Sequence, residues 1–333
     1  MNAQHANPAT MRPGRHEFHA LAAQHTVVPV WAEVLGDLET PVAAYLKLVG
    51  DGDGFLLESV EHAERWARYS FVGHDPVATL ELRDGLIEIK GQHLSADIPL
   101  DQGMLAALDA IIAAYRAPII PDLPPLQGGV MGYLGYDTIR EVEHLPHVPH
   151  DDRGFPDAVM SIIGSLAAFD HWRQRVYLIE SVPVLDMNTE AIDREYDEAC
   201  VRVQRAVDKL SQPLSSPAAE PPQLGEAAPE VRSSMADGVY QQAVEVAKEH
   251  ILAGDIFQVV LAQRYDIDLQ ADPFDFYRVL RQVNPSPYMY FLRHPDITIA
   301  GSSPEPMVKV LGRTVVSRPI AGTRRRGRTD DDD

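Results

Sequence analysis

The residues best suited by type to do chemistry lie near the end of the 333-residue sequence. Glu305 lies in a Ser-Ser-Pro-Glu-Pro run between two segments with strand character. Further on, Gly322 can present backbone N–H groups and Thr323 a hydroxyl, which together can hold a carboxylate. A cluster of positive charge follows at Arg324, Arg325, Arg326 and Arg328. The pattern indicates an anion-binding loop, with a solvated loop and an ordinary exposed glutamate as the alternative.

Two motifs suggest metal binding, but neither has the pattern that a metal site requires. Asp51-Gly52-Asp53-Gly54 resembles the start of a calcium loop, but Phe55 stands where that loop needs an oxygen ligand. A tight turn before a strand is expected instead. His144, His147 and His150 recur every third residue among prolines, which disrupt the helix or strand that would hold them as ligands. No metal site is predicted at either place.

Three glycines are predicted to allow close packing of the backbone rather than to bind a ligand. Gly128, Gly132 and Gly135 match neither a dinucleotide fingerprint nor a phosphate loop, since no helix follows a strand at the required spacing. We expect a strand packed closely against another backbone.

Helices and short strands must position these residues. Apolar spacing predicts a helix over Met104–Tyr115, with Leu105, Leu108, Ile111 and Ile112 on one stripe, and a longer helix over Asn188–Leu210. β-Rich runs predict strands at 54–58, 86–90 and 176–180.

The last hundred residues mix both element types. A helix is expected after Asp237, its predicted N-cap, and is expected to end at Gly254. Alternating apolar residues from Phe257 to Leu269 predict a strand whose second face, with Gln258, can line a pocket. A helix is expected at 273–283, and strands at 297–301, 307–311 and 314–318. Without a βαβ rhythm, the fold class predicted is α+β.

Composition divides the chain and narrows its function. We expect a flexible arm at 1–26, a domain at 27–210, a linker with five prolines at 211–234, and the start of a second domain at 235–333. The net charge of −20 argues against nucleic-acid or membrane partners. A single cysteine, Cys200, and no visible targeting signal fit a cytoplasmic protein.

Six segments, taken together and in order, resemble the large subunits of anthranilate synthases, within the chorismate-utilising enzymes. They are Leu56-Leu57-Glu58-Ser59, Arg68-Tyr69-Ser70-Phe71-Val72-Gly73, Gly254-Asp255-Ile256-Phe257-Gln258-Val259-Val260-Leu261, Asn284-Pro285-Ser286-Pro287-Tyr288-Met289, Gly301-Ser302-Ser303-Pro304-Glu305 and Pro319-Ile320-Ala321-Gly322-Thr323-Arg324.

The resemblance implies a fold and a reaction. It implies an α+β fold with orthogonal antiparallel sheets and flanking helices, and conversion of chorismate and ammonia to anthranilate and pyruvate in tryptophan biosynthesis. Mg²⁺ is the implied cofactor. A glutamine amidotransferase subunit is the implied source of ammonia, and tryptophan the implied feedback inhibitor.

Two positions separate this chain from related enzymes. Isochorismate-forming relatives carry a lysine that activates water where Gln258 stands here. Aminodeoxychorismate synthases carry a nucleophilic lysine where Ala321 stands. Both differences favour the anthranilate-forming branch, with those two enzymes and a non-catalytic tryptophan-binding or partner-binding module as the alternatives.

The resemblance also implies site residues. Glu305 would protonate the departing C4 hydroxyl of chorismate, while Gly322 and Thr323 would hold a ligand oxygen. The tryptophan site would use eight residues from two distant segments: Glu58, Ser59, Asn284, Pro285, Ser286, Pro287, Tyr288 and Met289.

Relatives are expected to continue well beyond Arg328 and to carry the metal-ligating glutamates and a catalytic histidine in that continuation. The sequence is therefore expected to be a fragment that is truncated at its C-terminus, is inactive alone and supplies no metal ligand itself.

Overall fold

The computed structural model describes residues 8–61, 65–66, 68–92, 94, 97–214, 221, 229–320, 322, 325–329 and 331. Its internal contacts divide the chain into two compact units. Unit 1 comprises Met1–Ala218 and Leu280–Ser303, and unit 2 comprises Ala219–Val279 and Pro304–Asp333. Unit 1 therefore contains a segment that lies beyond the proline-rich stretch in the sequence.

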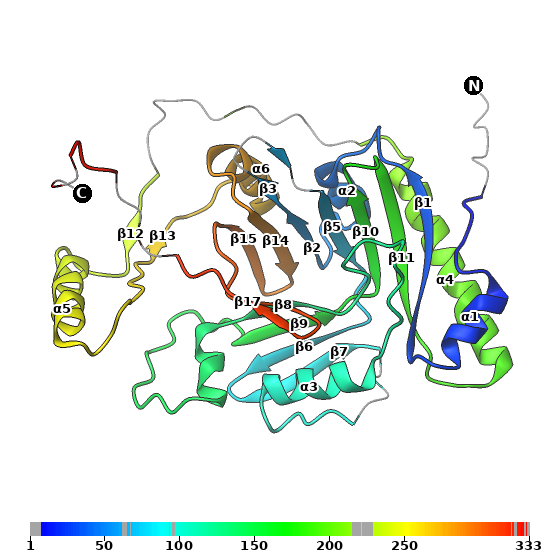
Figure 1. The fold of residues 1–333 in the computed structure, drawn as a ribbon, viewed down its shortest axis with the longest axis horizontal. Helices are drawn as coiled ribbons and strands as arrows, with labels where there is room; N and C mark the ends of the chain where they lie inside the picture. Colours follow the sequence, from blue (N-terminus) through cyan, green and yellow to red (C-terminus); the bar gives the residue numbers. More distant parts are fainter. Residues whose placement is uncertain are drawn as a thin grey trace. The chain divides into compact units, whose positions relative to one another are not determined.

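Unit 1 is built on a seven-stranded antiparallel sheet in the order β1-β11-β10-β5-β2-β14-β15 (Figure 1). The last two strands form a hairpin that is distant in sequence but pairs with β2 through β14. In spatial order, the strands are β1 (Val27–Leu35), β11 (Arg175–Pro183), β10 (Ser165–Asp170), β5 (Tyr69–His74), β2 (Gly54–Glu58), β14 (Tyr288–His294) and β15 (Ile297–Ser303).

A four-stranded antiparallel sheet forms a second layer of unit 1, in the order β7-β6-β9-β8. Its strands are β7 (Leu86–Gly91), β6 (Ala78–Arg83), β9 (Ala158–Ile162) and β8 (Val130–Leu134). They run across the strands of the first sheet (Figure 1). Mixed helices and crossed antiparallel sheets confirm the predicted α+β class.

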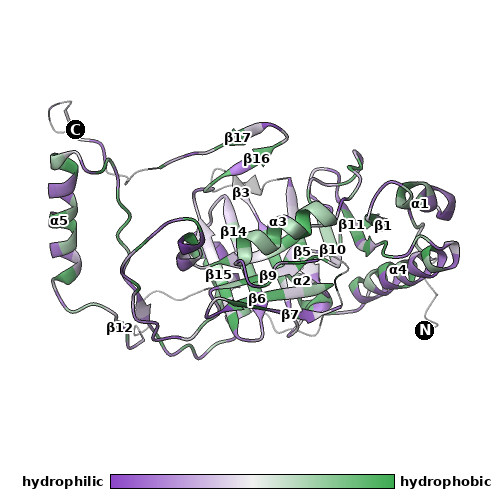
Figure 2. Cartoon of the chain, turned by 90° about the horizontal axis from the view of Figure 1, so that it is seen from below, coloured by the Kyte–Doolittle hydropathy of each residue, from purple (hydrophilic) through white to green (hydrophobic). Residues whose placement is uncertain are grey.

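Apolar side chains fill the space on each side of the second sheet. One core includes Trp31, Leu166 and Tyr177 of the large sheet, with Met131 and Tyr133 of β8 packed against it. The other core joins β6 and β9 to α3 (Met104–Ala114), which Figure 2 colours largely as hydrophobic. Burial of this apolar surface is the main stabilising contribution.

Three helices of unit 1 pack on one another and on strands of the large sheet. They are α1 (Arg15–Ala22), α2 (Pro41–Leu48) and α4 (Thr189–Leu210). The predicted start of α4 is confirmed, because the Asn188 side chain accepts a hydrogen bond from Glu190 N at 2.9 Å. A short 3₁₀ helix, η1 (Tyr136–Glu141), and the two-residue strands β3 (Val60–Glu61) and β4 (Arg65–Trp66) complete the unit.

The predicted close approach of backbones is confirmed at Gly132 and Gly135 and is wrong at Gly128, whose Cβ would instead lie 2.6 Å from the side-chain Oγ of Ser181. A Cβ on Gly132 would lie 1.9 Å from the carbonyl oxygen of Val159 on the neighbouring strand, and one on Gly135 would lie 2.7 Å from Asp157 O. Only glycine allows β8 to lie this close to its neighbour.

Unit 2 has few regular elements. They are β12 (Arg232–Ser233), α5 (Val239–Ala253), β13 (Tyr265–Asp266), β16 (Lys309–Leu311) and β17 (Thr314–Val316). Helix α6 (Pro273–Val283) begins in this unit and ends in unit 1. Gly254 ends α5 with φ +82°, as predicted, but the N-cap is Gly238 and the prediction of Asp237 is wrong.

The structure differs from two further predictions, the flexible arm at 1–26 and the strand from Phe257 to Leu269. The described part of the expected arm, residues 8–26, contains α1, whose Phe18 is fully buried with its ring centroid 5.1 Å from that of Tyr196. The strand expected from Phe257 to Leu269 is wrong except at β13. No other described strand pairs with that run, and an alternating pattern without a hydrogen-bonded partner does not form a strand.

The buried stripe of α3 also differs from the prediction. Met104, Ala107 and Ile111 face the core, whereas Ile112 is 67% exposed. Leu108 is partly buried against the same core.

Candidate functional site

Three sequence-distant segments of unit 2 meet at Ile320. Its backbone N–H donates to Glu305 Oε1 at 2.8 Å, and its carbonyl oxygen accepts from Gln258 Nε2 at 3.1 Å. Gln258, Glu305 and Ile320, which lie in three separate segments of the sequence, are thus joined through the backbone of one residue. We call Gln258, Glu305, Ile320 and Gly322 the Ile320 cluster.

The Ile320 cluster is open to a ligand. Glu305 is partly buried, while Gln258, Ile320 and Gly322 are exposed. Among the described residues that are not its neighbours in the chain, none has an atom within 4 Å of where a Cβ on Gly322 would be. The cluster combines the carboxylate of Glu305, the side-chain amide of Gln258 and the exposed residue Gly322. Thr323 lies outside the described residues.

The eight residues expected to bind tryptophan gather in unit 1. Glu58 ends β2 and is opposite Met289 in the register of β14. Ser302 Oγ donates to Asn284 O at 2.6 Å and lies 2.9 Å from Ser286 Oγ, which fixes the loop before β14. Ser59 follows β2, and Pro285, Pro287 and Tyr288 complete the loop and begin β14.

Arg281 is the residue of this second site that the sequence analysis did not identify. Its Nε lies 2.6 Å from Glu58 Oε2, and its Nη2 donates to Glu58 Oε1 at 2.8 Å. The carboxylate is 1% exposed and the guanidinium side chain 19%. A basic residue in the last turn of the predicted helix, three positions before Asn284, was the available signal.

One group of described side chains lies close enough to share a metal ion, namely Glu81, His294 and Asp296. Lys90 and Arg83 already neutralise Glu81. Burial raises the pKa of Glu81, but hydrogen bonds from Lys90 and Arg83 outweigh it, so the pKa is lowered overall. A neutralised carboxylate beside an imidazole does not suit Mg²⁺, which prefers several oxygen ligands. His144, His147 and His150 are exposed in a loop.

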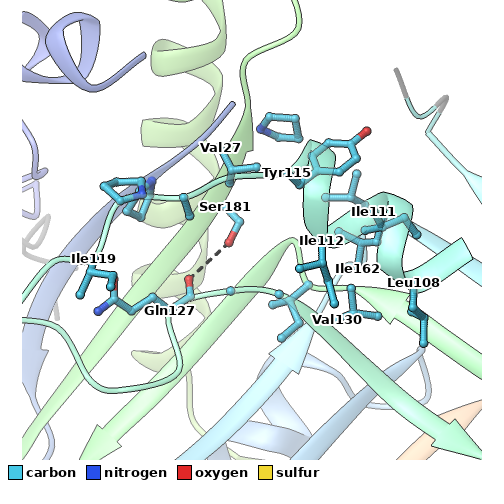
Figure 3. A pocket seen from close by; sticks show the side chains of 18 of the residues that line it. Val27, Leu108, Ile111, Ile112, Tyr115, Ile119, Gln127, Val130, Ile162 and Ser181 are labelled. Carbon is cyan, nitrogen blue, oxygen red and sulfur yellow. Dashed lines mark hydrogen bonds between the residues drawn. The ribbon is translucent and has the colours of Figure 1, made fainter. Parts of the chain in front are cut away.

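A cleft of about 700 Å³ in unit 1 contains none of the predicted site residues (Figure 3). Ile112, Tyr115 and Ile119 line it, and Ser181 Oγ donates to Gln127 O at 3.4 Å beside it. The lining carries no charged side chain. A site for a substrate with two carboxylates needs cationic or N–H donors, so this cleft is not the candidate active site.

The two crossed antiparallel sheets make this an α+β protein. The Ile320 cluster, with the Glu305 carboxylate and the exposed Gly322, is its candidate anion site. Residues 56–333 match the family model described as chorismate binding enzyme, and the chain belongs to this family.

Several relatives are named anthranilate synthase component 1. The protein of that name from Mycobacterium tuberculosis (strain CDC 1551 / Oshkosh) is 40% identical over 329 residues, covering 96% of this chain and 63% of the relative. The one from Arthrobacter globiformis is 38% identical, covering 96% and 62%. The chain thus spans less than two thirds of the length of these relatives.

The fold of this chain is also similar to that of a solved structure. The crystal structure of anthranilate synthase component I from Streptococcus pneumoniae TIGR4 matches with a TM-score of 0.59 at 28% identity. The match covers 85% of this chain and 59% of that one. Among the residues described here, no helix is long and apolar enough to cross a membrane.

Proposed function

We propose that this chain is part of an anthranilate synthase large subunit, which converts chorismate and ammonia to anthranilate, pyruvate and water. Family membership and the names of relatives at about 40% identity support the substrate and the reaction class. The observation that carries the proposal is the Ile320 cluster, because it joins a carboxylate to the loop expected to hold the substrate.

The residues of the cluster would divide the chemistry between them. Gly322 of the cluster and Thr323, which follows it in the sequence, hold a chorismate oxygen through N–H and hydroxyl donors. Glu305 gives a proton to the C4 hydroxyl, which leaves as water while the nitrogen of ammonia bonds to C2. The added nitrogen loses a proton. Loss of the C2 proton and cleavage of the C3–O bond then release the enolpyruvyl group, which takes up a proton to become pyruvate, and the ring becomes aromatic.

The identities of two residues favour amination by free ammonia. Gln258 holds Ile320 through its amide and has no basic group to activate water for an isochorismate product. Ala321 offers no nucleophile for covalent attack on the ring. Ammonia would come from a glutamine amidotransferase partner, in keeping with the name component 1 of the relatives.

Mg²⁺ belongs to the proposal as a family expectation, and none of the described residues is assigned to it. The described carboxylate–histidine group does not fit the ion. We therefore propose no step of the reaction through a metal held by this chain.

Feedback inhibition by tryptophan belongs to the proposal because of the organised site in unit 1. Glu58 on β2 lies opposite Met289 on β14, Ser59 follows β2, and Asn284, Pro285, Ser286 and Pro287 form the loop that leads into β14. The same site supports a second candidate function, tryptophan binding without turnover, for the 333-residue chain alone. The single cysteine fits the proposed cytoplasmic location.

Product analysis tests the proposed reaction. The protein encoded by the complete reading frame, supplied with chorismate, Mg²⁺ and ammonium, is expected to form anthranilate and pyruvate in equal amounts. Tryptophan is expected to inhibit it. The 333-residue chain is the matched control, expected to yield no anthranilate because the resemblance places the metal-ligating glutamates and the catalytic histidine beyond Arg328. Accumulation of isochorismate or aminodeoxychorismate would contradict the proposal.

A further inference from the structure

The cleft of about 700 Å³ in unit 1 is large enough for a small molecule (Figure 3). Its lining comes from β1 and β11 of the large sheet, from β8 and β9 of the second sheet, and from α3. All of these elements belong to unit 1. The volume lies within the range of about 300–1,000 Å³ that is usual for ligand pockets.

The cleft has a buried apolar floor and an exposed apolar rim. Among its lining residues, Ile111 and Ile163 are only 2% and 3% exposed. Ile112 and Ile119 also line it, and they are 67% and 89% exposed. A ligand that covers the rim removes these two isoleucines from water, which favours binding.

The lining disfavours charged ligands. Among the described residues, no charged side chain lines the cleft, although the chain contains 29 Lys and Arg and 49 Asp and Glu residues. A charged ligand would lose its hydration there and gain no ionic partner, which is costly. The cleft therefore suits an uncharged molecule.

A buried hydroxyl adds a polar group to the cleft. Ser181 is 7% exposed, and its Oγ donates to the carbonyl oxygen of Gln127 at 3.4 Å. A serine hydroxyl that donates one hydrogen bond keeps lone pairs that can accept another. Gly128 leaves the space for it, because a Cβ on Gly128 would lie 2.6 Å from Ser181 Oγ. An N–H or O–H group of a ligand therefore has an acceptor here.

The segment that carries Gln127 is held in place by its own chain. Gln127 Nε2 donates to Ile120 O at 2.9 Å, and Gln127 Oε1 accepts from Ile120 N at 3.3 Å. Figure 3 shows Gln127 and Ser181 on one side of the cleft, with Leu108 and Ile111 of α3 on the other. The polar and apolar sides are thus already arranged, as in most small-molecule sites.

We propose that this cleft is a binding site for an uncharged, mainly apolar small molecule that carries a hydrogen-bond donor. The proposal goes beyond the proposed function, because none of the residues assigned there to chorismate or tryptophan lines the cleft.

Two fluorescent probes on one scaffold test the preference for uncharged ligands. N-Phenyl-1-naphthylamine is uncharged and has one N–H group, and 8-anilino-1-naphthalenesulfonate differs from it by a sulfonate. Each is titrated into the protein from the complete reading frame. The uncharged probe is expected to bind at a single site, and the sulfonate at least about tenfold more weakly, because the cleft offers it no cation.

Variants at the rim locate the bound probe. Ile112→Glu and Ile119→Glu place a carboxylate at the cleft and are each expected to weaken N-phenyl-1-naphthylamine at least about tenfold. Leu38→Glu is the matched control, because Leu38 is 94% exposed and does not line the cleft. It is expected to leave binding unchanged. All three positions are exposed, and thermal unfolding checks that each variant is folded.

A third probe tests the role of the hydroxyl. Ser181→Ala is expected to weaken N-phenyl-1-naphthylamine about twofold to tenfold, as for the loss of one hydrogen bond. 1-Phenylnaphthalene, which has no N–H group, is measured by competition and is expected to bind Ser181→Ala as it binds the wild type. Equal effects on both probes would show that the ligand needs no donor.

Three results would overturn the proposal. They are the absence of saturable binding of N-phenyl-1-naphthylamine, equal binding of the sulfonate, and unchanged binding in both folded rim variants. Binding to the 333-residue chain but not to the protein from the complete reading frame would also overturn it, because another part of the polypeptide would then cover the cleft.

Discussion

Buried carboxylates of unit 1 are paired with cations. Glu58 pairs with Arg281, and Asp170, whose side chain is 2% exposed, pairs with Arg68. Arg68 donates to both carboxylate oxygens and lies 4.8 Å from the ring centroid of Tyr69. Burial alone would raise the pKa of Asp170, but the hydrogen bonds from Arg68 and from backbone N–H groups outweigh it and lower the pKa.

This pairing predicts a pH dependence of stability. Because the pKa of Asp170 is lower in the folded state, its contribution is fully present above the unfolded pKa, which is about 4 for an aspartate. That contribution is lost as the pH falls through the folded pKa. Asp170→Asn is expected to cost about 1–3 kcal/mol in free energy of unfolding at pH 7, and less at pH 3, in urea titrations. An equal cost at both pH values would contradict this account.

Single-residue chemistry was only partly predictable from the sequence. The resemblance gave Glu58 and the segment Asn284–Met289, and the structure places Glu58 on β2 opposite Met289 on β14, with residues 284–287 in the loop before β14. Arg281 was not identified, because one arginine at the end of a helix has no sequence feature that marks its partner. Only the pairing of β14 with β2 brings it within 3 Å of Glu58.

At the scale of elements, strands β8 and β9 show how closely sequence and packing are linked. Gly132 has no space for a side chain, since its Cβ would overlap the carbonyl oxygen of Val159 at 1.9 Å. A backbone atom cannot move aside as a flexible side chain can, so the two strands would have to separate.

Gly132→Ala is therefore expected to destabilise unit 1 by about 1–3 kcal/mol. Gly14→Ala is the matched control, because no atom lies within 4 Å of its Cβ position and its φ is −67°. It is expected to change stability by less than about 1 kcal/mol. Thermal or urea unfolding measures both variants, and equal effects would show that the close approach is not limiting.

Elements with local signals were predicted better than those that need distant partners. β2 and α6 match their predicted bounds, because their patterns and end signals lie within the segments themselves. The run from Phe257 to Leu269 has a strand pattern, yet only Tyr265–Asp266 is paired. Pairing depends on another strand lying alongside, which periodicity does not reveal.

At the scale of the whole chain, the two candidate sites lie in different units. The tryptophan candidates belong to unit 1, while Gln258, Glu305 and Gly322 belong to unit 2. The sequence boundaries did not predict that Leu280–Ser303 joins unit 1, because that assignment comes from pairing across more than 200 residues. Inhibition at a distance then requires a coupling free energy between the sites.

The central claim is that the Ile320 cluster carries out the chemistry on chorismate, with Glu305 as its acid. The most direct test is the rate of anthranilate formation by Glu305→Gln in the protein from the complete reading frame. The account predicts that kcat falls about 10²–10⁴-fold, the usual contribution of general acid catalysis. Glu245→Gln on the exposed face of α5 serves as the control and is expected to keep the wild-type rate. A Glu305→Gln enzyme with kcat near that of wild type would contradict the claim.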